Sequence, residues 1–269
     1  MAVRTVARPR HLPDHLLAEG VSWATTEELA SRLGVEPARL PDSLERARAA
    51  GRILSITKGA WLVVPPEYLR WGAPPPTHYV DAWMRHLGHP YYVGLLSAAA
   101  HHGIAHHAAQ VFQVVTTARL RDRTIGRSRI DFVHAVDVAS RPTVVATVPT
   151  GRLMVASVEV TLLDLVAHPK RSGGLGNVAT IVANAVQDGR IDAQRIIQAS
   201  ATYRPAAVQR LGFVIEHAAK HLGRDVDLAA MAQFVRGRRI VPLDLRGHAH
   251  GPADPRWRVL VNAPLEIDA

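Results

Sequence analysis

Three polar residues on one expected helical face offer the most specific chemistry in this sequence. Arg39, Ser43 and Arg46 are spaced by four and three residues, so an α-helix aligns them in one stripe. The opposite face is apolar and consists of Leu40, Leu44 and Ala47. An arginine on such an outward stripe can donate two hydrogen bonds to a guanine in the major groove. The pattern is typical of a DNA-recognition helix.

Hydroxyls and cations near this helix are spaced for contacts with phosphates. Lys58 occupies the tip of an expected hairpin, and Arg48 and Arg52 flank it. These cations would contact the DNA backbone and set the register without reading sequence. Thr25 and Thr26 begin a preceding helix, whose N–H groups and hydroxyls can bind a phosphate.

The first fifteen residues carry Arg4, Arg8 and Arg10 together with two prolines, without helical periodicity. Such a basic arm can enter a minor groove or neutralise phosphates, and a solvated, frayed terminus is the alternative. The complete predicted DNA-binding set is Arg10, Thr25, Thr26, Arg39, Ser43, Arg46, Arg48, Arg52 and Lys58.

The elements that would position these residues are those of a winged helix-turn-helix. Thr25 and Glu28 match a capping box that starts a helix, and Gly34 supplies the turn after it. A second helix is expected from residue 37 or 41 to residue 50, and a β-hairpin around residues 57–59. A short helix over residues 14–20 would complete the core. The alternative is a protein-binding module that does not contact DNA.

Composition narrows the class of protein. The 269 residues contain no cysteine, which excludes disulfides and thiolate chemistry. No long apolar run or signal peptide is visible, so we expect a cytoplasmic protein without a membrane partner. The net charge of +9 favours an acidic partner such as nucleic acid. Residues 1–72 hold ten Lys/Arg against eight Asp/Glu, whereas residues 73–269 hold twenty-two against fifteen.

Proline density suggests a domain boundary. We expect a winged-helix domain over residues 1–72, a proline-rich linker over 73–77 and an α+β domain over 78–269. Few contacts should cross the linker, so each part should fold alone. The second domain begins with two helices, continues with strand-like runs and then turns helical from residue 156. The runs expected to form a mainly antiparallel sheet are QVFQVVTT, RIDFVHAV and PTVVATVP.

A basic segment lies between the first two of these runs. It contains Arg119, Arg121, Arg123, Arg127 and Arg129. As a hairpin loop it could bind nucleic acid or an acidic protein face, and a solvated turn is the alternative.

Four histidines raise the possibility of a metal site. His101, His102, His106 and His107 are clustered, and the 102/106 pair has the spacing that places two imidazoles on one helical face. Gly103 is expected to end the helix between them, and the glutamate of a zinc-protease motif is absent. We therefore expect no bound metal, and a His-cluster metalloenzyme is kept as an alternative.

Other catalytic patterns are incomplete. The glycine-rich GGLGN lacks the Lys-Ser/Thr ending of a phosphate loop, and Asp131 has no paired acid nearby. Glu159 and Asp164 are five residues apart on one helix, so they do not share a face. We expect no catalytic residues, no cofactor and no enzymatic activity.

Several motifs together resemble the AbiEi antitoxins of bacterial toxin–antitoxin systems, mycobacterial relatives included. They are TTEELASRLGV, GRILSITKGAWLVVP, YYVGLLSAAAHHGI, QVFQVVTT, VASVEVTLLDLVAHP, GGLGNV, QRLGFVIEHA and RWRVLVN. The resemblance implies a winged helix joined to an α+β antitoxin domain, a nucleotidyltransferase-like toxin as partner and repression of a shared operon. The His-dense HHGIAHH is unusual for this pattern.

We therefore expect an antitoxin that binds promoter DNA as an autorepressor, with dimerisation on the DNA. A winged-helix regulator without a toxin partner is the alternative.

Overall fold

The computed structural model describes residues 8–105 and 110–267. Its N-terminal module alternates short helices and strands in the order α1, β1, α2, α3, α4, β2 and β3. The bounds are α1 Leu12–Ala18, β1 Trp23–Thr25, α2 Thr26–Leu33, α3 Leu40–Ser43, α4 Glu45–Ala49, β2 Ile53–Thr57 and β3 Ala60–Val63. The strands form a three-stranded sheet in the order β1-β3-β2. This arrangement is compatible with a winged helix-turn-helix.

Local signals set the start and end of α2. The Thr25 side chain accepts from the backbone N–H of Glu28, whose carboxylate accepts from the N–H of Thr25, which completes the capping box. Gly34 ends the helix in the left-handed conformation, with φ of 66°.

The expected second helix is divided into two short pieces. A 3-10 segment over Pro37–Arg39 precedes α3, and Leu44, with φ of −96° and ψ of 0°, separates α3 from α4. The Leu44 N–H donates to Leu40 O, and the Arg48 N–H donates to Leu44 O. These bonds continue across the break, so the expected helical stripe is kept.

The second part of the chain is built on a six-stranded sheet in the order β6-β7-β5-β4-β9-β8. Its strands are β4 Tyr91–Val93, β5 Val111–Thr116, β6 Arg123–Ile125, β7 Ser128–His134, β8 Thr143–Val148 and β9 Gly151–Ala156. Three neighbouring pairs are antiparallel, whereas β5–β7 and β4–β9 are parallel. The sheet is mainly antiparallel, as expected, and β5 lies parallel to β7 because the short β6 reverses the chain between them.

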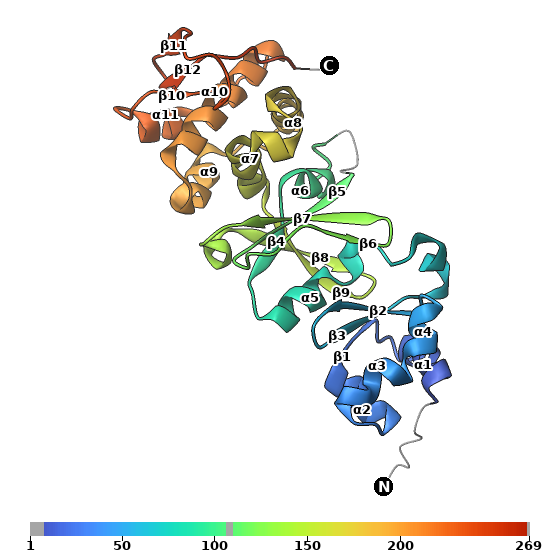
Figure 1. The fold of residues 1–269 in the computed structure, drawn as a ribbon. Coiled ribbons are helices and arrows are strands. Elements are labelled where there is room, and N and C mark those ends of the chain that lie inside the picture. Colours follow the sequence, from blue (N-terminus) through green and yellow to red (C-terminus); the bar gives the residue numbers. More distant parts are fainter. Residues whose placement is uncertain (1–7, 106–109, 268–269) are drawn as a thin grey trace.

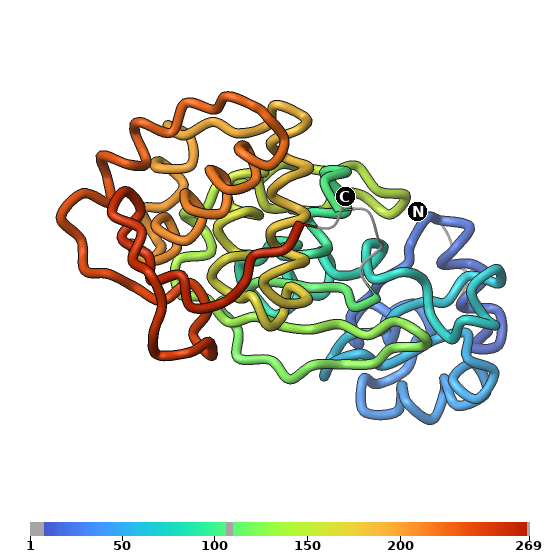
Figure 2. Tube along the Cα trace, turned by 90° about the horizontal axis from the view of Figure 1, so that it is seen from above, coloured from blue at the N-terminus to red at the C-terminus, as the bar shows by residue number. Residues whose placement is uncertain are grey.

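Helices cover both faces of this sheet, and the fold is α+β (Figure 1). Helix α5 lies on the face nearer the N-terminal module, and α6 and α7 lie on the other face. The helices are α5 Val80–Leu87, α6 Leu95–His101, α7 Val158–Ala167, α8 Leu175–Gln187, α9 Ala193–Ala199, α10 Pro205–His221 and α11 Ala229–Val235. Figure 2 shows the α8–α11 region and the N-terminal module at opposite ends of the molecule.

A small sheet and several 3-10 segments complete the described structure. Strands β10 Val241–Pro242, β11 Ala253–Asp254 and β12 Val259–Leu260 pair in the order β10-β12-β11. The 3-10 segments are η1 Pro9–His11, η2 Pro37–Arg39, η3 Pro66–Trp71, η4 Pro76–His78, η5 Val138–Ser140, η6 Pro169–Ser172 and η7 Ser200–Thr202. None of the helices in the described ranges combines the length and the apolar character that a membrane crossing requires.

The two parts of the chain share a packed boundary. Side chains alternate between the faces of β3, so Trp61 and Val63 join the core of the N-terminal module while Leu62 joins the larger core. Ile56 on β2 also joins the larger core, and Ala73 is buried. The expectation of few contacts across the proline-rich segment is therefore corrected. The division at residues 72 and 78 stays a prediction.

Candidate functional site

The expected recognition stripe is exposed on the N-terminal module. Arg39 and Arg46 are exposed, and Ser43 between them is partly exposed. The Ser43 hydroxyl donates to the backbone carbonyl of Arg39 at 3.1 Å, which fixes it along the helix. The opposite face is buried and consists of Leu40, Leu44 and Ala47. The amphipathic pattern is thus confirmed, and the two arginine side chains are available to a ligand.

A groove of about 460 Å³ brings the basic arm to this stripe. Arg8 and Arg10 line it from one side, and Ser43 and Arg46 line it from the other. Asp42 and Glu45 also line the groove, so its charge is mixed. The structure therefore places three predicted residues, Arg10, Ser43 and Arg46, around one concave surface.

Both arginines that were expected to flank Lys58 have interaction partners inside the N-terminal module. Arg52 forms an ion pair with Asp14 at 2.5 Å, and its side chain is 22% exposed. The Arg48 guanidinium lies over the Trp61 ring, 5.9 Å from the centroid. Arg52 holds α1 against the start of β2, whereas Arg48 stays at the surface.

Lys58 lies at the tip of the β2–β3 hairpin with an exposed side chain. Its backbone carbonyl accepts a hydrogen bond from Nε2 of His86 on α5 at 3.1 Å. The His86 ring also packs against Trp23, with centroids 6.1 Å apart. The hairpin tip is therefore held against the second part of the chain, while the Lys58 side chain stays exposed to solvent.

Thr25 and Thr26 make hydrogen bonds within the module. The backbone N–H and the side-chain hydroxyl of Thr25 both belong to the capping box. The Thr26 N–H donates to Gly59 O at 2.9 Å, and its hydroxyl accepts from the Trp61 indole at 2.9 Å. A hydroxyl that accepts one bond still has a proton to donate. Phosphate binding by these threonines, like DNA contact by the other seven residues, stays a prediction.

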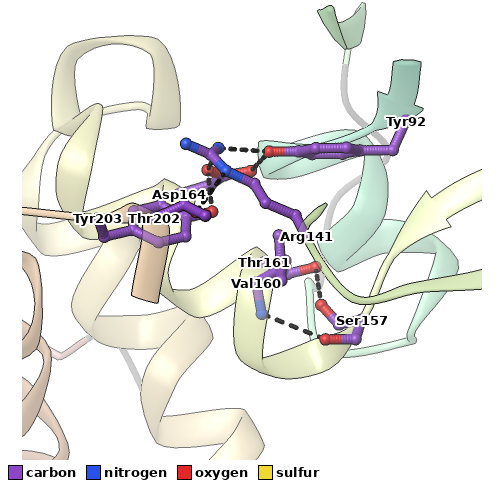
Figure 3. Close-up of polar contacts among 8 residues, drawn as sticks. All are labelled: Tyr92, Arg141, Ser157, Val160, Thr161, Asp164, Thr202 and Tyr203. Carbon is purple, nitrogen blue, oxygen red and sulfur yellow. Dashed lines mark hydrogen bonds and ion pairs between the residues drawn. The ribbon is translucent and has the colours of Figure 1, made fainter. Parts of the chain in front are cut away.

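A buried polar network, which the sequence reasoning missed, lies in the second part of the chain (Figure 3). Asp164 on α7 has no exposed surface. Its carboxylate accepts from the hydroxyls of Tyr92 at 3.0 Å and Tyr203 at 2.7 Å, and from Arg141 at 3.1 Å. Arg141 also donates to the Tyr92 hydroxyl at 2.6 Å and to Thr202 at 3.2 Å.

The electrostatics of this network follow from its burial. Burial raises the pKa of Asp164 to about 6, although Arg141 and the two tyrosine hydroxyls oppose the rise. Burial also raises the pKa of Tyr92 and of Tyr203, so both phenols stay protonated donors. The Arg141 guanidinium stacks 4.1 Å from the centroid of the Tyr203 ring. These bonds join β4, α7, η7 and the segment before β8 into one unit.

The sequence does contain one signal for this network. Asp164 interrupts the apolar run TLLDLV, and an acid at the centre of a buried helix needs a partner. Glu159, five residues before Asp164, does not share its face of the helix. Its real partners are 23 to 72 residues away along the chain.

The histidine cluster is only partly described, because His106 and His107 lie outside the described residues. Nε2 of His102 donates to the Ala156 carbonyl at 2.6 Å, and burial lowers the pKa of His102. Within the described ranges, no three His, Asp or Glu side chains converge as metal ligands. Asp131 forms ion pairs with Arg129 at 3.3 Å and Arg171 at 3.6 Å.

The buried polar network around Asp164 lies in a part of the chain that matches a known protein family. Residues 92–217 match the family described as the AbiEi antitoxin C-terminal domain. These residues are therefore similar to an AbiEi antitoxin domain. Tyr92, Arg141, Asp164 and Tyr203 all fall inside this AbiEi match, so the network is part of the antitoxin domain.

A solved structure supports the fold over a longer range. The RV2827C protein from Mycobacterium tuberculosis aligns with a TM-score of 0.65 and 15% identity, over 96% of this chain and 93% of that one. This likeness shows the fold alone. No curated protein matches the sequence.

The match to the AbiEi antitoxin C-terminal domain supports the role of an antitoxin in a toxin–antitoxin system. The domain implies a toxin partner of some kind and suggests a regulatory, non-enzymatic role.

Proposed function

We propose that this AbiEi-type antitoxin counteracts a nucleotidyltransferase-like toxin in the cytoplasm and represses its own promoter by binding DNA there. The antitoxin domain over residues 92–217 supports the first activity. The nature of the toxin is inferred from the motifs that resemble AbiEi antitoxins. The N-terminal module supports the second activity.

The exposed stripe of Arg39, Ser43 and Arg46 carries the DNA-binding part of the proposal. Its two arginines have no ion-pair partner among the described residues, and Leu40 and Leu44 anchor the helix from beneath. An anchored helix with free guanidinium groups can enter a major groove, where arginine reads guanine. Arg8 and Arg10 line the groove beside the stripe, where they can reach the phosphate backbone of the adjoining DNA.

The test separates the two activities in cells. The chain and the nucleotidyltransferase-like toxin encoded next to it are co-expressed, and growth is scored beside a reporter of the chain's own promoter. We expect wild type to restore growth and to repress. Arg39→Ala with Arg46→Ala should restore growth but lose repression, because the antitoxin domain is unchanged. Arg224→Ala, which replaces an exposed arginine three residues after the end of α10, is the matched control.

Three results would contradict parts of the proposal. Failure of wild type to restore growth against that toxin would overturn the toxin assignment. Repression that survives the double substitution would overturn the recognition stripe. Growth rescue lost together with repression would show that the N-terminal module is itself needed against the toxin.

A further inference from the structure

The six-stranded sheet ends in two edge strands, β6 and β8, which differ in length and in charge. Strand β6 has three residues and begins with the exposed Arg123, and just after it the Arg127 N–H donates to Trp71 O. Strand β8 has six residues, TVVATV, and none of them is charged. A short, charged or covered strand protects the edge of a sheet from further pairing, whereas a longer apolar strand favours it. Of the two edges, β8 is therefore the one suited to accept another strand.

Both faces of the sheet are open at β8. Val144 and Val145 are consecutive residues of one strand, so their side chains lie on opposite faces of the sheet. They are 40% and 63% exposed, and Thr147 is exposed as well. The described helices that cover the centre of the sheet therefore leave this edge uncovered on both sides. Another strand can approach β8 in the plane of the sheet.

The hydrogen bonds between β8 and β9 show which backbone groups of β8 face away from the sheet. Just before β8, Pro142 O accepts from the Ser157 N–H at 3.0 Å, and the register of the two strands then continues without a shift. Bonding and non-bonding residues alternate along an antiparallel pair, so the even-numbered residues of β8 bond to β9. The N–H and C=O groups of Thr143, Val145 and Thr147 therefore point outward, and no described residue outside the sheet bonds to them.

We propose that β8 pairs with β8 of a second copy of the chain, antiparallel and about a two-fold axis, which joins the two six-stranded sheets into one. Two identical strands placed antiparallel are related by such an axis, so the same surface serves both copies. One register uses all the outward groups: Val145 lies opposite Val145 of the other copy, and Thr143 lies opposite Thr147. Each of these three pairs exchanges two hydrogen bonds, which gives about six in all.

The distribution of charge favours a second copy of the chain as the occupant. The chain has a net charge of +9, so two copies repel each other over most of their surfaces, whereas β8 itself is uncharged. Arg152, opposite Thr147, is the one charged residue of β9. In the proposed register the two copies of Arg152 are about 20 Å apart, which exceeds the screening length at physiological salt. The β8 edge therefore lets two copies meet without bringing like charges together.

The assembly closes at two copies. Pro142 and Pro149 border β8, and a proline cannot donate a bond to a neighbouring strand, so the pairing does not extend beyond the strand. The other edge, β6, is short and carries Arg123, so a third copy finds no matching edge. This pairing needs no DNA and goes beyond the proposed promoter binding. It relates the recognition stripes of the two copies by the same two-fold axis, as in helix-turn-helix dimers on palindromic sites.

The absence of cysteine from the chain allows a direct test of the register. Val145→Cys places a single thiol per chain on the two-fold axis, where the two Cα atoms are about 5.5 Å apart, within the range that a disulfide spans. Mild oxidation of the purified full chain without DNA should link most of this variant into dimers. Thr124→Cys, at an exposed position in the middle of β6, is the matched control and should stay monomeric. Equal linking of the two variants would overturn the proposal.

Sedimentation velocity measures the association without a crosslink. We expect wild type to pass from monomer to dimer at protein concentrations of about 1–100 μM. Val145→Lys places two like charges opposite each other on the axis, and it should weaken the dimer at least about ten-fold. Its melting temperature should stay near that of wild type, because position 145 is exposed. Thr124→Lys is the matched control and should associate like wild type.

Three results would decide against the β8 dimer. Wild type that stays monomeric over the whole concentration range would overturn it, and so would a dimer of unchanged strength in Val145→Lys. If wild type is monomeric and the folded Val145→Lys variant no longer restores growth against the toxin, β8 accepts a strand of the toxin instead. Failure of a dimeric wild type to bind its promoter would overturn the proposed promoter binding alone and leave the β8 pairing intact.

Discussion

Arginines serve opposite purposes in the two halves of this molecule. Arg46 in the N-terminal module is exposed and has no ion-pair partner among the described residues, whereas the Arg141 side chain is 9% exposed and bonded to Asp164, Tyr92 and Thr202. The Arg46 guanidinium can therefore donate hydrogen bonds to a ligand. The Arg141 guanidinium donates its hydrogen bonds within the antitoxin domain and holds that domain together. Exposure and partners, rather than residue type, therefore separate binding residues from structural ones.

The largest effect should come from breaking the buried pair. Arg141→Ala leaves the Asp164 carboxylate without its cation, and we expect a loss of about 3–5 kcal/mol in the free energy of unfolding. Urea denaturation measures it. The joint replacement of Arg141 by Met and Asp164 by Leu should recover much of the loss, because no charge is then left buried. A loss below about 1 kcal/mol in Arg141→Ala would show that the network does not stabilise the domain.

The second prediction concerns the pH dependence of stability. The pKa of Asp164 is raised from 3.8 to about 6 in the folded chain, so the folded state binds its proton more tightly than the unfolded state. Its contribution to stability is therefore full below about pH 4 and is lost as the pH rises through 6. The unfolding free energy of wild type relative to Asp164→Asn should fall over that range, by up to about 3 kcal/mol. A flat difference would contradict the raised pKa.

The third prediction concerns Arg46, the exposed arginine of the two. Arg46→Ala should weaken promoter binding by about 1–3 kcal/mol and relax sequence preference, because a base contact is lost. Its unfolding free energy should stay within about 0.5 kcal/mol of wild type. Gel shifts and urea denaturation give the two values. A large loss of stability without a change in binding would reverse the roles assigned to Arg46 and Arg141.

The smallest effect is expected at the wing tip. Lys58→Ala should weaken all DNA sequences about equally and make the salt slope shallower by about 1, because a phosphate contact carries no sequence information. Gel shifts over a salt series measure this. A loss confined to the promoter sequence would mean that Lys58 reads bases.

The parts of the fold that sequence predicted depend on neighbouring residues. Thr25 with Glu28 forms its expected helix cap, because the two residues lie three positions apart. The stripe of Arg39, Ser43 and Arg46 survives the break at Leu44 because the helical hydrogen bonds continue there.

The parts that escaped prediction depend on distant residues. Strand β4 is short and buried, and its parallel pairing with β9 carries no local signature. Tyr92 meets Asp164 across 72 residues, so Asp164 in its apolar run indicates that a partner exists but not which residue it is. The packing of Leu62 on the larger core reflects a strand with two buried faces, which a single alternating pattern does not reveal. Prediction from the sequence therefore succeeded where the interacting residues lie within about one helical turn of each other.

The most direct test of the account is the affinity of the purified chain for its own promoter, measured by fluorescence anisotropy against a scrambled duplex of equal length at physiological salt. We expect promoter binding at least about a thousand-fold tighter than binding to the scrambled duplex. Arg39→Ala with Arg46→Ala should remove most of that preference, while Arg224→Ala should keep it. Equal affinity of wild type for both duplexes would contradict sequence-specific repression by this protein.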